Sequence, residues 1–247
     1  MALIEARDVE IGFGGPPILS GVNVDIEAGE IFAILGGSGC GKSTLLRHLI
    51  GLQAPQAGTI RVQGEDPAVA RQDAPPFGVM FQSGALFGSL TLTQNVALPL
   101  EEWSTLDADS IATVAAARLA LVGLDGFENH LPAEISGGMK KRAGIARALA
   151  LEPDILFLDE PSAGLDPVTS VELDELLLKL NANLGVTIVL VTHELDSLFK
   201  IAKRCVMLDR DAAGAIASGD PRALRDDSTD HRVHRFFNRQ SSGAAPA

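Results

Sequence analysis

Alternating apolar and polar residues predict strands with one face in solvent near the start of the chain. The pattern is clearest in Val22-Asn23-Val24-Asp25-Ile26 and in Gly58-Thr59-Ile60-Arg61-Val62, and we expect a further strand at Ala6–Glu10. Period two is typical of a sheet with one solvated face. Together these segments predict an antiparallel sheet lying beside the apolar run 31–35.

Continuous apolar runs predict a second kind of strand. They occupy residues 31–35, 155–158 and 187–191. Runs without alternation suit a parallel sheet that is covered on both faces. The chain therefore predicts an α/β fold.

Helical patterns lie between and after these strands. Residues 43–50, closed by Gly51, read as a helix with an apolar face. An alanine-rich helix is expected at 109–122, and a second with repeating Arg and Ala at 140–151. The segment from about 83 to 151 therefore predicts a helical insertion between the apolar strands.

Composition narrows the possible partners. The chain has 247 residues, 46% of them hydrophobic, with a net charge of −12 and a pI near 4.8. This length and apolar content suit one α/β domain with an inserted subdomain, and the acidic balance argues against a nucleic acid partner. We see no bilayer-spanning run and no signal peptide, so we expect a cytosolic protein. Cys40 and Cys205 are too few for a disulfide framework, and we expect both to be reduced.

The most specific motif is a glycine-rich loop after the run 31–35. Gly36-Gly37-Ser38-Gly39-Cys40-Gly41-Lys42-Ser43 fits the pattern G-x-x-x-x-G-K-[ST], and Thr44 follows it. Glycines let backbone N–H groups fold closely around phosphate oxygens, and the next helix adds its positive N-terminus. Lys42 is expected to reach the β and γ phosphates and Ser43 to bind Mg²⁺. The alternatives are a glycine-rich turn without a ligand and, for Cys40, a small residue tolerated in the loop.

Two further motifs complete the pattern expected of a nucleotide site. Asp159-Glu160 follows the run 155–158, where one carboxylate would hold the metal and the other would face the γ-phosphate. We assign Asp159 to the metal and Glu160 to water activation; the alternative is an ordinary pair of turn acids. Ser136-Gly137-Gly138 opens a helix, and such an N-terminus is a ready anion site.

The order of these motifs resembles that in the ATPase subunits of ABC transporters, over residues 3 to 225. The motifs are the phosphate loop, Gln82 after an apolar strand, the Ser-Gly-Gly helix, Asp159-Glu160, Ser162-Ala163-Gly164-Leu165-Asp166 and His193. The resemblance implies a P-loop NTPase (RecA-like) core with a mainly parallel sheet, an antiparallel β subdomain and an inserted helical subdomain. It implies one ABC ATPase domain at 1–225, followed by a C-terminal extension at 226–247. Within the domain, 1–82 and 151–225 would form the core with the β subdomain, and 83–150 the helical subdomain.

The resemblance also implies roles for single residues. Phe13 would stack under the adenine, with a core residue as the alternative. Gln82 would join Mg²⁺ and the attacking water to the docking surface for the membrane subunit. Ser136, Gly137 and Gly138 would close on the ATP of a second copy, which makes the active unit a homodimer. Asp166 would act across that interface and His193 would contact the γ-phosphate, although a strand-end histidine can also be structural.

One departure from the commonest pattern indicates a subfamily. Met139 stands where glutamine is usual, so a side-chain bond to the ribose is lost. Two lysines follow Met139, and this feature is combined with the sequences of segments 80–87 and 92–100. In these three places the chain is similar to the ATPases that work with MCE-domain proteins in bacterial lipid transport. The Mla-type phospholipid system is one example. This implies a permease, an MCE-domain lipid-binding protein and, in many cases, a small STAS-domain protein. It also implies a position on the cytoplasmic face of the inner membrane. The alternatives are an ABC ATPase for another substrate and a soluble ABC ATPase outside transport.

Two surfaces carry partner hypotheses. Residues Ser83–Leu100, with Phe87, predict a permease-docking groove, with packing between subdomains as the alternative. The polar segment from Asp226 predicts a mobile tail, in which Phe236 and Phe237 would anchor on a neighbouring subunit.

Overall fold

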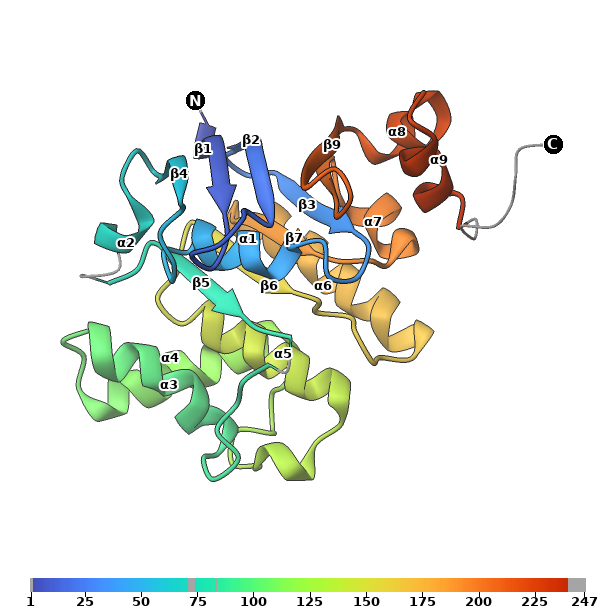
Figure 1. Cartoon of the computed structure of the whole chain (residues 1–247). Coiled ribbons are helices and arrows are strands. Elements are labelled where there is room, and N and C mark those ends of the chain that lie inside the picture. Colours follow the sequence, from blue (N-terminus) through green and yellow to red (C-terminus); the bar gives the residue numbers. More distant parts are fainter. Residues whose placement is uncertain (1, 71–73, 83, 240–247) are drawn as a thin grey trace. The chain divides into compact units, whose positions relative to one another are not determined.

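The computed structural model describes residues 2–70, 74–82 and 84–239, and the chain divides into two compact units (Figure 1). The first unit comprises Met1–Ala68 and Val191–Ala247, and the second comprises Val69–Leu190. Helix α2 (Pro67–Ala70) spans the residue at which the first unit ends. Within the described ranges, no helix is long and apolar enough to cross a membrane.

An antiparallel sheet forms one part of the first unit. Its order is β2 (Leu19–Glu27), β1 (Ala2–Ile11) and β4 (Ala57–Val62). Alternate residues of β2 are buried, as the period-two pattern predicts. At Gly58, φ is +81° and a Cβ would lie 2.4 Å from the carbonyl oxygen of Arg7, so a side chain there would prevent β4 from pairing with β1.

Three other strands of the first unit carry its apolar core. β3 (Ile31–Gly36) is buried throughout and pairs in parallel with β8 (Arg204–Asp209), which pairs antiparallel with β9 (Gly214–Gly219). Helix α1 (Lys42–Leu49) follows β3, and α7 (Leu195–Ile201) precedes β8. The chain therefore leaves the buried end of β3 directly into the glycine-rich loop.

The C-terminal helices pack onto the same core, which corrects the hypothesis that the late aromatic pair anchors on a neighbouring subunit. Helices α8 (Pro221–Asp227) and α9 (His231–Phe237) follow β9. Phe237 is only 3% exposed, in a cluster with Leu198 and Val233, and Phe236 packs partly against that cluster. Apolar rings fill an apolar site within their own chain, so residues up to Phe237 form a docked helix rather than a mobile tail. Residues 240–247 lie outside the described residues.

Among the described residues, the second unit contains three strands and the four longest helices. β5 (Phe77–Met80) pairs in parallel with β6 (Ile155–Asp159), and β7 (Thr187–Val191) is the next strand in order. The helices are α3 (Leu92–Trp103), α4 (Ala108–Leu121), α5 (Gly137–Ala148) and α6 (Pro167–Leu184), with a 3-10 turn η1 (Pro132–Glu134) before α5. In Figure 1, α3, α4 and α5 lie side by side, and these helices contact one another. Trp103, the last residue of α3, is 39% exposed.

The predicted elements are all present, with ends shifted by a few residues. The largest shift is at β1, which begins at Ala2 against a predicted start at Ala6. Helix α5 begins at Gly137 and ends at Ala148, against a predicted helix at 140–151. Ser136 caps this helix and thereby fixes its start. The division into a core at 1–82 and 151–225 and a helical subdomain at 83–150 stays a prediction.

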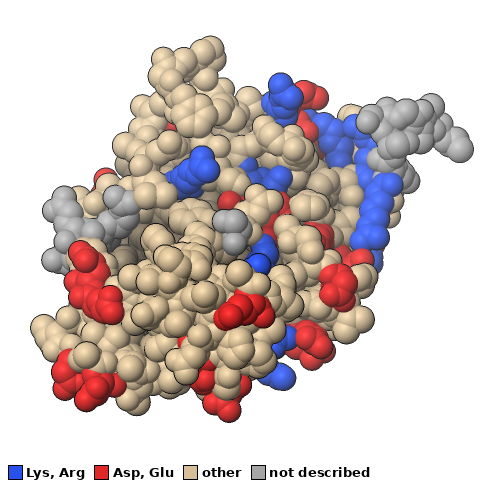
Figure 2. All heavy atoms as spheres, turned by 90° about the horizontal axis from the view of Figure 1, so that it is seen from below, with Lys and Arg blue, Asp and Glu red and all other residues tan. Residues whose placement is uncertain are grey.

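The chain carries a net charge of −12. On the face shown in Figure 2, acidic and basic side chains lie in small separate groups among uncharged ones.

Candidate functional site

The glycine-rich loop joins β3 to α1 through backbone conformations that favour glycine. φ is +144° at Gly36, +73° at Gly39 and +100° at Gly41. At Gly36 a Cβ would lie 2.3 Å from the carbonyl oxygen of Leu208 and 2.5 Å from the Sγ of Cys40, so no larger residue fits there. At Gly37 and Gly39, by contrast, a Cβ would meet nothing within 4 Å. The loop is thus fixed at its base and open at its exposed rim.

Positive charge is gathered at this loop. The Lys42 ammonium donates hydrogen bonds to the carbonyl oxygens of Gly36 at 2.9 Å and Gly37 at 3.0 Å, and Lys42 is also the first residue of α1. Ser43 and Thr44 follow it in the first turn of the helix. Burial raises the pKa of the Cys40 thiol, which keeps this side chain neutral at physiological pH. An open loop with a helix N-terminus and one ammonium fits phosphate groups with a bound Mg²⁺.

Two other predicted residues belong to the same unit. Phe13, in the connection between β1 and β2, is 66% exposed, so the alternative that it is a core residue is wrong. The N–H of Thr192 donates to the carbonyl oxygen of Ile34 at 3.3 Å, and this bond fixes the residue before His193 against β3. His193 is exposed. The structure therefore brings His193 to the strand that enters the phosphate loop.

The acidic pair lies in the second unit, at the end of β6. Asp159 is the last residue of the strand, and both Asp159 and Glu160 are buried, with Glu160 8% exposed. Glu160 has a φ of +50°, a conformation that costs a non-glycine residue about 1–3 kcal/mol. Strain of this kind clusters at functional sites, which favours a special role for Glu160 over an ordinary turn acid.

The Ser-Gly-Gly turn packs closely against the start of α6. The Ser136 Oγ accepts a hydrogen bond from the N–H of Met139 at 3.2 Å and so caps α5. A Cβ at Gly138 would lie 2.5 Å from the Cγ2 of Thr169, whereas at Gly137 the nearest atom would be 3.9 Å away. The two glycines therefore differ: Gly138 is required by packing, and Gly137 is exposed.

Asp166 caps α6 beside this turn. Its carboxylate accepts hydrogen bonds from the N–H groups of Val168 and Thr169 and from the Thr169 hydroxyl at 2.5 Å. These bonds, led by that from the Thr169 hydroxyl, lower the pKa of Asp166. The side chain remains exposed, so capping leaves part of it accessible to a ligand or a partner.

The segment after β5 is held by a residue that the motifs did not single out. The Lys141 ammonium donates to the carbonyl oxygen of Gln82, and also to that of Glu160 at 3.1 Å. The structure therefore brings Gln82, α5 and Glu160 together within the second unit. The helical spacing of Lys141, Ile145 and Ala148, which form a buried face, is the sequence signal that could have indicated that Lys141 points inward.

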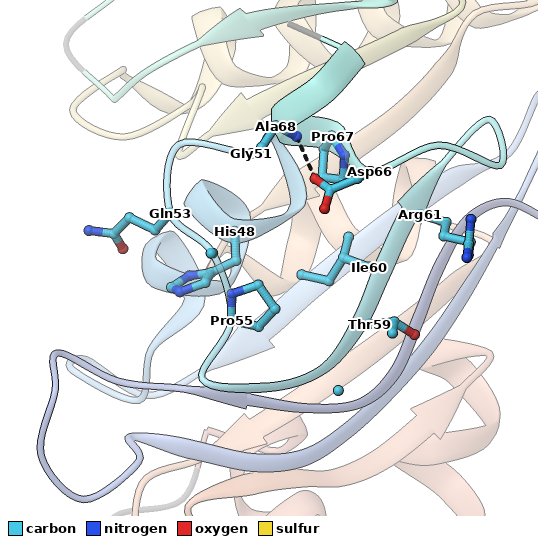
Figure 3. A pocket seen from close by; sticks show the side chains of 12 residues that line it. His48, Gly51, Gln53, Pro55, Thr59, Ile60, Arg61, Asp66, Pro67 and Ala68 are labelled. Atoms are coloured by element: carbon cyan, nitrogen blue, oxygen red, sulfur yellow. Dashed lines mark hydrogen bonds between the residues drawn. The ribbon is translucent and has the colours of Figure 1, made fainter.

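A cavity at the other end of α1 does not coincide with the phosphate loop. It measures about 190 Å³ and is lined by His48, Gly51, residues of β4 and Asp66 (Figure 3). In this view the polar ends of Gln53 and Arg61 extend to opposite sides, so they do not converge on one point. His48 is buried and directs its Nδ1 to the carbonyl oxygen of Thr44 at 2.8 Å, a bond within the helix. This cavity lacks the convergent polar groups of a binding site.

Comparison with known sequences identifies the family. The family model described as "ABC transporter" matches residues 19–163. The chain is 40% identical, over 245 residues, to the probable ribonucleotide transport ATP-binding protein mkl of Mycobacterium leprae, covering 97% of this chain and 70% of that protein. It is 42% identical, over 224 residues, to the methionine import ATP-binding protein MetN of Brucella abortus, covering 89% of this chain and 60% of MetN.

Solved structures agree with the sequences. CbiO1 from Clostridium perfringens, part of the ABC transporter complex cbiONQ, matches with a TM-score of 0.82 at 29% identity, over 92% of this chain and 91% of that one. The ATP-binding cassette MJ0796, in a dimeric post-hydrolysis state bound to ADP and Pi, matches with a TM-score of 0.77 at 30% identity, over 88% and 98%. The predicted P-loop NTPase fold, with a mostly parallel sheet, an antiparallel sheet and helices, is confirmed. The chain belongs to the ABC transporter family, as an ATPase subunit that hydrolyses ATP with Mg²⁺.

Proposed function

We propose that this subunit powers lipid transport across the bacterial cell envelope, together with a permease and an MCE-domain lipid-binding protein. The proposal rests on the sequence after Gly137-Gly138. There Met139 replaces the usual glutamine, and Lys140-Lys141 follows. The inward orientation of Lys141 supports a structural reason for a basic residue at this position. A small STAS-domain protein is a further expected partner.

The hydrolytic roles are proposed for the residues named by the motifs. Glu160 orients and polarises the attacking water, while Lys42 and His193 stabilise the charge that develops on the γ-phosphate. Ser43, Asp159 and Gln82 are the residues proposed to hold Mg²⁺, which would supply neutralisation of phosphate charge. Phe13 stacks on the adenine, and Gly36–Thr44 surround the phosphates.

The active unit is proposed to be a homodimer. Ser136 and Gly137 are exposed at the start of α5, and Asp166 is exposed at the start of α6. Exposed groups at two adjacent helix starts are suited to contact a nucleotide bound by a second copy. Two ATP molecules would then lie between the halves, each in contact with both subunits.

The permease is proposed to dock on the second unit, next to Gln82. Phe87 is 57% exposed, and its backbone N–H donates to Asn95 Oδ1 at 2.7 Å. The buried Asn95 also donates to the carbonyl oxygens of Phe87, Leu90 and Thr91, and so holds this loop in one shape. A rigid loop that presents an aromatic side chain favours docking over simple packing. Ser83, the first residue of the predicted groove, lies outside the described residues.

A cavity of about 530 Å³ adjoins the docking segment. It lies between β5, α3 and α5, and is lined by Phe77, Leu98, Pro99 and Trp103 among others. Its apolar and aromatic lining suits a short amphipathic helix of a permease. The subunit would accordingly sit on the cytoplasmic face of the inner membrane.

The test is affinity purification of the tagged full chain from solubilised bacterial membranes. Recovery of a permease with an MCE-domain protein supports the proposal. A permease that carries nucleotides or methionine, as the names of the relatives suggest for those proteins, would overturn the lipid assignment. If the chain forms an ATP-dependent dimer but no permease is recovered, it belongs to the soluble type.

The site assignment has its own test. Glu160→Gln should abolish ATP turnover and trap an ATP-bound dimer, because the amide cannot polarise the water. Turnover at the parent rate would remove Glu160 from the role. Phe87→Asp should abolish permease binding while leaving ATP binding intact, with the exposed Leu52 of the first unit changed to Asp as the matched control.

A further inference from the structure

Lys141 is a buried lysine whose ammonium lies between two segments of the proposed site. It is 8% exposed and projects from the second turn of α5. Its ammonium donates to the carbonyl oxygen of Gln82, and to the carbonyl oxygen of Glu160 at 3.1 Å. Burying an ammonium costs free energy unless it is well hydrogen-bonded, so its position depends on these acceptors.

The acceptor at Glu160 is a strained residue. Its φ of +50° is a conformation that persists only where the surroundings hold it in place. The hydrogen bond from Lys141 is one such constraint, because it fixes the direction of the Glu160 carbonyl. The orientation of this peptide group in turn sets where the Glu160 side chain leaves the backbone.

A second contact joins α5 to the segment that follows Gln82. The Arg147 guanidinium donates to the carbonyl oxygens of Gly84 at 3.0 Å and Ala85 at 2.7 Å. Between the two cations, a Cβ at Gly144 would lie 3.3 Å from the carbonyl oxygen of Gly84, so helix and segment are in close contact. Burial lowers the pKa of Arg147, as expected for a cation that is largely removed from water.

We propose that Lys141 is a positioning residue that couples the Ser136 end of α5 to Glu160 and Gln82. This rests on the roles proposed above for those three residues. A movement of α5 when Ser136 engages the ATP of the partner subunit would shift the Lys141 ammonium, and with it both carbonyl groups. Engagement at one ATP thereby sets the geometry of the carboxylate that serves the other.

The experiment compares Lys141→Met, Lys141→Arg and the control Lys140→Met in the full chain. Met keeps the length of the side chain but removes all its donors, whereas Arg keeps them. Lys140 is the adjacent, half-exposed residue. For each variant the kcat and KM of ATP hydrolysis are measured, together with the Kd for ATP.

The expected result for Lys141→Met is a fall in kcat of about 100-fold, since a misplacement near 1 Å can cost that much. The Kd for ATP should stay within about twofold, because the phosphate loop is unchanged. Lys141→Arg should recover most of the lost kcat, and Lys140→Met should match the parent. A fall in ATP affinity with unchanged kcat would overturn the proposal, as would a normal kcat in Lys141→Met.

Folding and the site assignment are controlled separately. If Lys141→Met does not fold, Lys141→Leu, which also lacks a donor, replaces it with the same criteria. Retained turnover in Glu160→Gln would show instead that the proposed role of Glu160 is wrong. If Glu160→Gln keeps its turnover, the proposed coupling of Lys141 to Glu160 is overturned too, even when Lys141→Met lowers kcat. A fall in kcat in both Glu160→Gln and Lys141→Met supports the coupling.

Discussion

Gly138 and Thr169 approach so closely that a Cβ on the glycine would lie 2.5 Å from the Cγ2 of the threonine. This contact joins the N-terminal turn of α5 to that of α6, and it brings Ser136 near Asp166, the cap of α6. Packing between the two helices thus requires glycine at position 138, independently of any ligand.

We predict that Gly138→Ala destabilises the protein. The added methyl group must displace Thr169 or α6, and overpacking of this kind costs about 1–3 kcal/mol. Urea unfolding should show a lower free energy of unfolding by that amount, and ATP turnover should fall because the turn moves.

Two variants control this prediction. Gly137→Ala should be neutral or slightly stabilising, since the nearest atom would be 3.9 Å away and alanine favours helix. The double variant Gly138→Ala with Thr169→Ser removes the Cγ2 but keeps the hydroxyl that donates to Asp166. Should the double variant be as unstable as Gly138→Ala alone, the threonine contact is not the cause.

Phe13→Ala is predicted to weaken nucleotide binding without loss of stability. The ring is 66% exposed, so its removal should change the free energy of unfolding by less than about 0.5 kcal/mol. Loss of a stacked aromatic costs about 1–3 kcal/mol, which corresponds to a rise in the Kd for ATP of about 5- to 150-fold. Isothermal titration measures the Kd, and Phe13→Trp should restore it. An unchanged Kd in Phe13→Ala would exclude the stacking role.

Phe237→Ala is predicted to destabilise the isolated chain. A buried phenylalanine replaced by alanine costs about 3–5 kcal/mol, and Phe237 is packed with Leu198 and Val233. Thermal unfolding should show a clear fall in Tm, and Phe236→Ala, at a partly buried position, a smaller one. The opposite pattern, normal stability with weakened dimerisation, would restore the anchor hypothesis.

Cys205 is predicted to make stability decline at alkaline pH. Burial raises the pKa of its thiol to about 12 in the folded chain, against an ordinary value of 9.0. Folding therefore favours the protonated thiol; this contribution is complete below pH 9 and is lost as the pH rises toward 12. Urea midpoints at a series of alkaline pH values should fall less steeply in Cys205→Ala than in the parent. An identical slope in the two proteins would contradict the assignment.

The sequence predicted the order of the strands along the chain and the phosphate loop because these features are local. The alternation in β2 reflects burial of one face of its strand, and the apolar run in β3 reflects burial of both faces. Gly36 and Lys42 stand at the fixed spacing of the phosphate-loop motif. The exposure of Phe13 was left open, since a single aromatic after a strand suits both a core and a surface position.

Features that depend on contacts distant in sequence were missed. Lys141 and Gln82 are separated by 59 residues, and Lys141 sits in a basic run that reads as a solvated face. Phe237 was assigned to a tail because its neighbours are polar, while the apolar site it fills is built from β3, β8 and α7. In both cases the partner lies on another element, which local patterns do not reveal.

Trp103 gives the protein a built-in optical reporter. It is the only tryptophan, and the chain has no tyrosine, so the intrinsic emission under long-wavelength ultraviolet excitation arises from the end of α3 alone. The indole lines the cavity proposed to receive the permease. Its emission maximum and quenching therefore follow the wetting of this cavity, and docking can be titrated on the unlabelled, unmodified subunit.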